Sequence, residues 1–165
     1  MPLGGLITLA ILLPNLLMLL LPPREVPPEP VRKEPRLRAM EAVERVGQAG
    51  AFLIPFFYPL PVLREASVDA LVVMGLALGF YYSAWTRYAS KGHRFLLLYA
   101  PFLGVPLPLA VAPVFYFLAA AVFLGSWPLA VAVVFLAAGH LYVSYHEWNR
   151  CRLGTGTAAY IARRG

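Results

Sequence analysis

The chain has 165 residues, of which 60% are hydrophobic and 13% are charged, and its formal net charge is +6. Soluble domains are about 45–50% apolar and about 25% charged, so this composition excludes an ordinary soluble domain and indicates an integral membrane protein. The positive charge does not indicate nucleic-acid binding, because the basic residues lie in short loops between apolar runs, where they set membrane topology. We therefore expect a single membrane domain over residues 1–165.

The first apolar run covers residues 3–21 and is just long enough to cross a hydrocarbon core of about 30 Å. No Lys or Arg precedes it, which favours a retained helix over a cleaved signal peptide. Six prolines between Pro22 and Pro35 predict a stiff, extended cytoplasmic linker over residues 22–36. Apolar residues at near-helical spacing then predict a short amphipathic helix over residues 37–45, lying on the membrane surface.

Four further spans are predicted from hydropathy, and prolines within or beside them predict kinked helices. They cover residues 46–63, 68–85, 107–124 and 128–145. Several prolines make residues 95–106 a poor regular helix, which indicates an interfacial or re-entrant piece. Gly75 and Gly79 have the small-xxx-small spacing that lets helices approach closely, so a homodimer packed through them is one option.

The basic residues support the count of five spans independently of hydropathy. All of the 14 Lys and Arg residues except Arg64 fall in the first and third loops and the C-terminal tail, which share one side of a five-span arrangement. Short loops rich in Lys and Arg stay in the cytoplasm. The predicted fold is therefore an all-α integral membrane protein of the cell (inner) membrane. It is a five-transmembrane-helix bundle with its N-terminus outside and its C-terminus in the cytoplasm.

With this topology, polar and aromatic side chains gather in the cytoplasmic half, which predicts a ligand-binding pocket open to the cytoplasm. Guanidinium groups would bind an anionic head, aromatic rings would hold a flat or greasy body, and polar groups would orient it. The predicted pocket residues are Arg45, Gln48, Tyr82, Trp85, Arg87, His140 and Ser144. An aromatic belt with a structural hydrogen bond between helices fits as well. In that case Asn15, Gln48 or a tyrosine hydroxyl would be the partner of His140.

No metalloprotease, phosphate-loop, dinucleotide or serine-nucleophile motif is present, so the sequence predicts no metal, no cofactor and no catalytic residue. Three functions stay open. The first is binding or transport of an amphipathic or aromatic anionic ligand, such as a lipid or small amphiphile. The second is an accessory or assembly subunit of a larger membrane complex. The third is an enzyme acting on a lipid head group, with His140, His146 and Glu147 as acid–base candidates.

Overall fold

The structure is a computed structural model that describes residues 4–28, 34–59 and 65–162, and all the regular secondary structure in these ranges is helical. This confirms the predicted all-α class. The α-helices are α1 (Gly5–Leu12), α2 (Leu17–Leu20), α3 (Pro35–Leu53), α4 (Glu65–Ser90), α5 (Pro108–Leu124) and α6 (Trp127–Ala162). Three 3₁₀ turns accompany them: η1 (Leu13–Leu16), η2 (Ile54–Phe57) and η3 (Phe95–Leu98).

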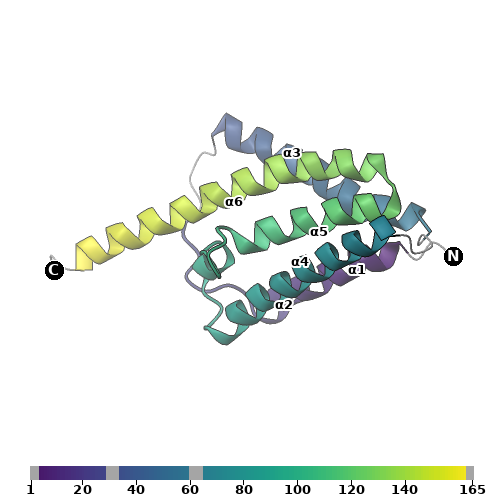
Figure 1. Ribbon diagram of the computed structural model, residues 1–165. Coiled ribbons are helices and arrows are strands. Elements are labelled where there is room, and N and C mark those ends of the chain that lie inside the picture. Colours follow the sequence, from purple (N-terminus) through teal and green to yellow (C-terminus); the bar gives the residue numbers. More distant parts are fainter. Residues whose placement is uncertain (1–3, 29–33, 60–64, 163–165) are drawn as a thin grey trace.

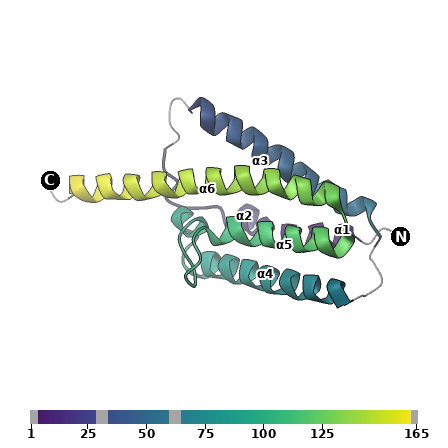
Figure 2. The same cartoon turned by 45° about the horizontal axis from the view of Figure 1, so that its top comes forward.

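The helices lie side by side and run in alternating directions along a common axis (Figure 1). Helix α3 packs against α6, α6 against α5, and α5 against α4, while α1 contacts α3 and η2. Turning the molecule shows the same order, with α5 between α6 and α4 (Figure 2). Helix α6 has 36 residues, or about 54 Å at 1.5 Å per residue, and its C-terminal end extends beyond the other helices.

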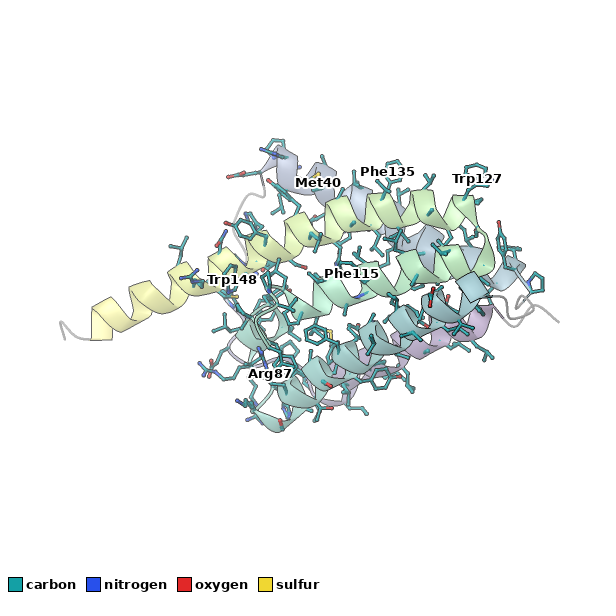
Figure 3. The ribbon with its side chains drawn as sticks, viewed as in Figure 1. Met40, Arg87, Phe115, Trp127, Phe135 and Trp148 are labelled. Carbon is teal, nitrogen blue, oxygen red and sulfur yellow. The ribbon has the colours of Figure 1, made fainter. Side chains whose placement is uncertain are left out.

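Two helices in the described ranges are long and apolar enough to cross a membrane, namely Val68–Ser90 and Trp127–Leu153. The apolar helices Gly5–Leu20 and Pro108–Leu124 are shorter. Large apolar side chains face outward on several of these helices, and Figure 3 shows two of them, Trp127 and Phe135, projecting from α6. The count of five membrane crossings therefore stays a prediction.

The predicted second span differs most from the structure. Helix α3 begins at Pro35, where a proline needs no N–H partner, and ends at Leu53, so it joins the amphipathic segment 37–45 to the first half of the span predicted over 46–63. Pro55 and Pro59 cannot donate the backbone bonds that would continue it. Some residues of the predicted spans and of the charge count lie outside the described ranges: Leu3, residues 60–63, Arg32, Lys33, Arg64, Arg163 and Arg164.

A proline in the first helix creates a tertiary contact. Pro14 has no N–H, so the carbonyl of Ala10, four residues earlier, loses its helical partner and the chain tightens into η1. The hydroxyl of Tyr82 on α4 donates to that carbonyl at 2.9 Å. Tyr116 and Tyr88 donate in the same way to the carbonyls of Ile7 and Leu21, both at 2.8 Å. These three bonds hold α1 and α2 against α4 and α5.

Glycines set the close packing of α3 on α6. A Cβ added to Gly139 would lie 2.4 Å from the backbone nitrogen of Glu44, and one added to Gly47 would lie 2.1 Å from that of Leu136. Sequence reasoning missed both residues. The two glycines it selected, Gly75 and Gly79, are exposed on α4 and meet no other atom within 4 Å of a built Cβ. They do not pack helices within the chain, and their role in a homodimer stays a prediction.

Candidate functional site

A cavity of about 300 Å³ lies inside the helix bundle, and every one of the long helices contributes to its wall. Most of the lining is apolar or aromatic. The lining residues are Ile11, Asn15, Met18, Gln48, Phe52, Tyr81, Trp85, Leu98, Tyr99, Leu109, Ala110, Pro113, Phe117, Leu136, His140 and Ser144. The cavity is half open, and a mostly apolar concave space with a few polar groups is the usual form of a small-molecule site.

Four of the seven predicted pocket residues line this cavity: Gln48, Trp85, His140 and Ser144. They come from three helices. They were predicted together because the predicted topology places them at a similar depth. Ser144 is one turn beyond His140 on α6, so both side chains face the same way. Their role as ligand-binding residues stays a prediction.

The other three predicted residues are not among the described residues that line the cavity. Arg45 is exposed on α3, and the Tyr82 hydroxyl is bonded to the Ala10 carbonyl. The Arg87 guanidinium donates to the carbonyls of the segment that follows α4. The sequence analysis assigned the Tyr82 and Arg87 donors to a ligand, but in the structure they bond backbone carbonyls that have no helical partner.

The partner of His140 is Glu44 on α3, where the sequence had suggested Asn15, Gln48 or a tyrosine. His140 Nδ1 lies 2.6 Å from Glu44 Oε1, and the two side chains are 25% and 17% exposed. With Glu44 as a carboxylate, Nδ1–H is the donor, and Nε2 is the ring nitrogen left for another partner. The sequence analysis missed Glu44 because its position in the amphipathic segment suggested the solvent-exposed face of that helix. Its spacing from Gly47, on the same side of α3, is the only sequence signal for it.

Trp85 is the polar group of the cavity wall that most clearly lacks a partner. Trp85 is 3% exposed, and its indole N–H lies near the Tyr81 hydroxyl but makes no hydrogen bond of good geometry among the described residues. Its ring is in edge contact with Tyr81 and Tyr88. The Tyr81 hydroxyl donates instead to Asn15 Oδ1 at 2.6 Å. A buried N–H without an acceptor is costly, so this donor points to a missing partner.

An irregular segment between α4 and α5 contributes Leu98 and Tyr99 to the lining of the cavity. Residues Phe102 to Val105 form a tight turn with two backbone hydrogen bonds, and Leu103 and Gly104 both have positive φ. The segment contains the predicted interfacial or re-entrant piece 95–106. Its depth in a membrane stays a prediction.

Arg87 holds this irregular segment in place. Its guanidinium donates to the carbonyls of Pro101 at 2.7 Å, Ala100 at 3.0 Å and Leu97 at 3.3 Å. It also lies over the Phe102 ring, 5.1 Å from the centroid. Figure 3 shows Arg87 at the end of α4 where this segment begins. The planar fork of donors suits a cluster of carbonyls that no helix satisfies.

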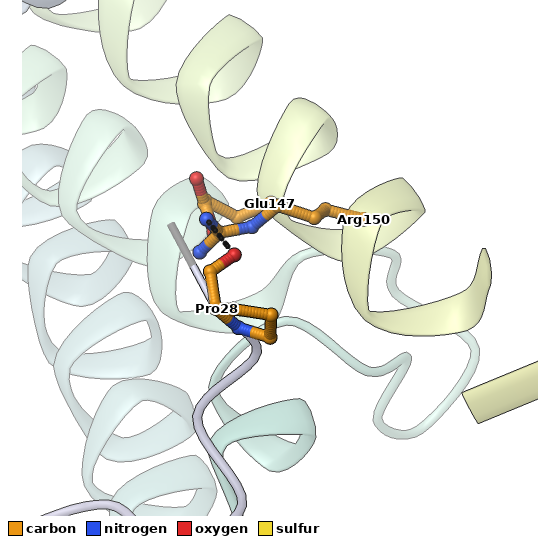
Figure 4. Close-up of polar contacts among 3 residues, drawn as sticks. All are labelled: Pro28, Glu147 and Arg150. Carbon is orange, nitrogen blue, oxygen red and sulfur yellow. Dashed lines mark hydrogen bonds and ion pairs between the residues drawn. The ribbon is translucent and has the colours of Figure 1, made fainter. Parts of the chain in front are cut away.

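The Pro-rich linker is attached to the same end of the bundle. Arg24 exchanges two backbone hydrogen bonds with the segment after α4, through His93 O at 2.8 Å and Phe95 N at 2.9 Å. Arg150 on α6 donates to the Pro28 carbonyl at 3.4 Å and to Glu147 Oε2 at 2.5 Å (Figure 4). These bonds anchor residues 22–28 of the linker to the bundle, and its predicted stiffness stays a prediction.

Tyr99 lies between the cavity and this polar end. Burial raises the pKa of its hydroxyl, and the charges of Glu147 and Glu44 act in the same direction. Tyr99 is therefore a neutral hydroxyl that can donate or accept in the cavity.

The cavity has the chemistry of a binding site more than that of a catalytic one. Its polar groups are neutral donors and acceptors together with one histidine, and no group of three or more His, Cys, Asp and Glu side chains in the described ranges could hold a metal ion. His146 and Glu147, the other acid–base candidates, are not among its described lining residues. Comparison with protein families, with curated proteins and with solved structures found no match for this chain.

Proposed function

We propose that this protein is a membrane protein that binds a small amphipathic or aromatic molecule in its central cavity. The single observation that carries the proposal is a half-open, mostly apolar cavity of about 300 Å³ whose wall contains the Trp85 indole N–H, a buried donor with only a weak contact to the Tyr81 hydroxyl. A ligand with an acceptor atom would satisfy this donor and fill the space. Without such a ligand, the unsatisfied donor and the empty space both lower the stability of the fold.

The outward surface supports a lipid environment. Leu6, Leu9 and Leu13 on the first helix are each more than half exposed, and α4, α5 and α6 also carry exposed apolar side chains. Such a surface is unfavourable in water and favourable in acyl chains. The proposal includes an inner-membrane location with the polar end of the bundle in the cytoplasm. Reporter tags on the two termini test it, and tags that report from the same compartment would contradict it.

The cavity favours a ligand without an anionic head. Arg45 and Arg87, the cations expected to bind such a head, are not among its described lining residues. A buried carboxylate or phosphate would then have only neutral donors to offset its desolvation. The proposal therefore replaces the anionic amphiphile expected from the sequence with a neutral one.

Native mass spectrometry after gentle extraction tests ligand binding directly. We expect a stoichiometric co-purifying small molecule on the wild-type protein and none on Ala110→Phe, because Ala110 is buried in the cavity wall and a phenyl group would fill the space. Ala49→Phe is the matched control, since Ala49 is exposed on α3. A smaller change, Ser144→Leu, covers the case in which Ala110→Phe does not fold. No bound molecule on wild-type protein would contradict the proposal.

A second candidate, an accessory subunit of a membrane complex, is favoured by the extension of α6 beyond the bundle (Figure 2). The backbone of this end of α6 lies away from the other helices. The test is a pull-down with full-length protein and with a variant ending at Leu153. A stoichiometric partner that is lost on truncation supports this function, and a homogeneous chain that carries a ligand and no partner opposes it.

A further inference from the structure

Besides Asn15, Tyr81 and Tyr99, the cavity has polar groups on two opposite walls. Trp85 comes from α4, whereas Gln48 comes from α3 and His140 and Ser144 come from α6. Helix α5 lies between α4 and α6 in both views of the fold (Figures 1 and 2). Its contribution is Leu109, Ala110, Pro113 and Phe117, so the floor between the two walls is apolar.

Both walls offer hydrogen-bond donors that carry no formal charge. The Trp85 indole can only donate. The Gln48 amide and the Ser144 hydroxyl can donate from the other side, and Ser144 is 5% exposed. His140 donates through Nδ1–H to Glu44, so its Nε2 is an acceptor and not a donor on this wall.

The space between the walls suits a flat ring. Phe52, Tyr81 and Phe117 provide aromatic surface around it, and Phe52 and Phe117 are in tilted contact with centroids 5.9 Å apart. Ring faces prefer offset or edge contacts of this kind. A volume of about 300 Å³ is at the lower end of ligand sites, so it fits one or two fused rings better than a whole lipid.

We infer that the cavity binds a quinone-type ring, a neutral cyclic dione with an acceptor oxygen at each end. One oxygen accepts from the Trp85 N–H and the other from the Gln48 amide or the Ser144 hydroxyl, while the ring lies on the apolar floor. This inference rests on the proposed function and names the class of its ligand. No electron or proton transfer is part of it.

The experiment uses the full chain in nanodiscs and two probes that differ only in the two oxygens. These are 2-methyl-1,4-naphthoquinone and 2-methylnaphthalene, measured by equilibrium dialysis against nanodiscs that contain the Ala110→Phe variant, which corrects for partition into lipid. We expect the quinone to bind at least about tenfold more tightly, because the hydrocarbon leaves donors unsatisfied on both walls. Trp85→Phe keeps the ring and removes the N–H, so quinone affinity should fall about three- to tenfold. Trp127→Phe is the control, since Trp127 is 76% exposed and remote from the cavity lining.

Each outcome decides a separate point. Equal binding of the two probes, or quinone binding unchanged in Trp85→Phe, overturns the quinone assignment and leaves the binding function standing. If the quinone does not bind but another molecule co-purifies, such as a phospholipid, the quinone assignment is again overturned and the binding function stands. Absence of both probe binding and any co-purifying molecule overturns the inference and the proposed function together.

Discussion

Glu44 and His140, 96 residues apart in the chain, form a close pair at the contact between α3 and α6, with 2.6 Å between Oε1 and Nδ1. Gly139, the residue before His140, lies against the backbone of Glu44 with no room for a Cβ. The close approach that this glycine permits brings the carboxylate to the imidazole. Because His140 also lines the cavity, the packing of two helices and the orientation of a site residue depend on one contact.

Replacement of Glu44 by Gln or Ala should destabilise the fold. Both side chains of the pair are mostly buried, so removal of one leaves the other without its charge-assisted partner, at a cost of about 1–3 kcal/mol. Thermal unfolding in mild detergent measures this loss. Glu25→Gln is the control, because Glu25 pairs with Arg94 at 2.9 Å where the side chains are 63% and 52% exposed, and it should change stability little. Equal effects of the two variants would contradict the structural role of the pair.

The glycines of the α3–α6 contact should be intolerant of a methyl group. Gly139→Ala and Gly47→Ala force a Cβ into backbone atoms and should cost about 1–3 kcal/mol or more. Gly75→Ala and Gly79→Ala meet open space and should stabilise the isolated chain by about 0.5–1 kcal/mol, since Ala is the better helix former. Unfolding midpoints of the four variants give the comparison. If Gly75→Ala instead lowers stability and dissociates a dimer on sizing, the homodimer prediction gains its support.

More of the residues that line the cavity than of their hydrogen-bond partners could be predicted from the sequence. Gln48, Trp85 and His140 were predicted together because alternating helix directions place them at one depth, and depth follows from chain order and charge. The close contact of Gly139 with Glu44 was missed because it depends on which helices become neighbours, and periodicity does not contain that information. The partner of His140 was missed for the same reason.

The span predicted over residues 46–63 stays a prediction, because residues 60–63 lie outside the described ranges. Its prolines were expected to kink or unwind the helix, and α3 does end at Leu53 and continue as the 3₁₀ turn η2. The sequence analysis assigned no structural role to Pro14 in the first helix. Pro14 leaves the Ala10 carbonyl without a helical donor, and the fold shows that Tyr82 supplies one.

The Tyr82 hydroxyl should matter only while Pro14 is present. Tyr82→Phe leaves the Ala10 carbonyl without a donor and should destabilise the fold by about 1–2 kcal/mol. In a Pro14→Ala background, the N–H of residue 14 can bond that carbonyl, so the same change should cost much less. A double-mutant cycle by thermal unfolding measures the coupling, and Tyr145→Phe, exposed on α6, is the control for a lost hydroxyl. Additive effects would show that the two residues do not act on the same carbonyl.

Loss of the Arg87 side chain should loosen the segment that contributes Leu98 and Tyr99 to the cavity lining. Arg87→Ala removes the donors to three carbonyls between Leu97 and Pro101, so hydrogen exchange of residues 95–105 should accelerate several-fold while that of α5 stays unchanged. Arg87→Lys keeps the charge but not the planar fork, and it should restore the protection only in part. Arg94→Ala, which removes an exposed arginine near the same segment, is the matched control. Unchanged exchange in Arg87→Ala would show that the turn and the 3₁₀ helix hold the segment by themselves, and Tyr99 would then keep its place in the cavity without Arg87.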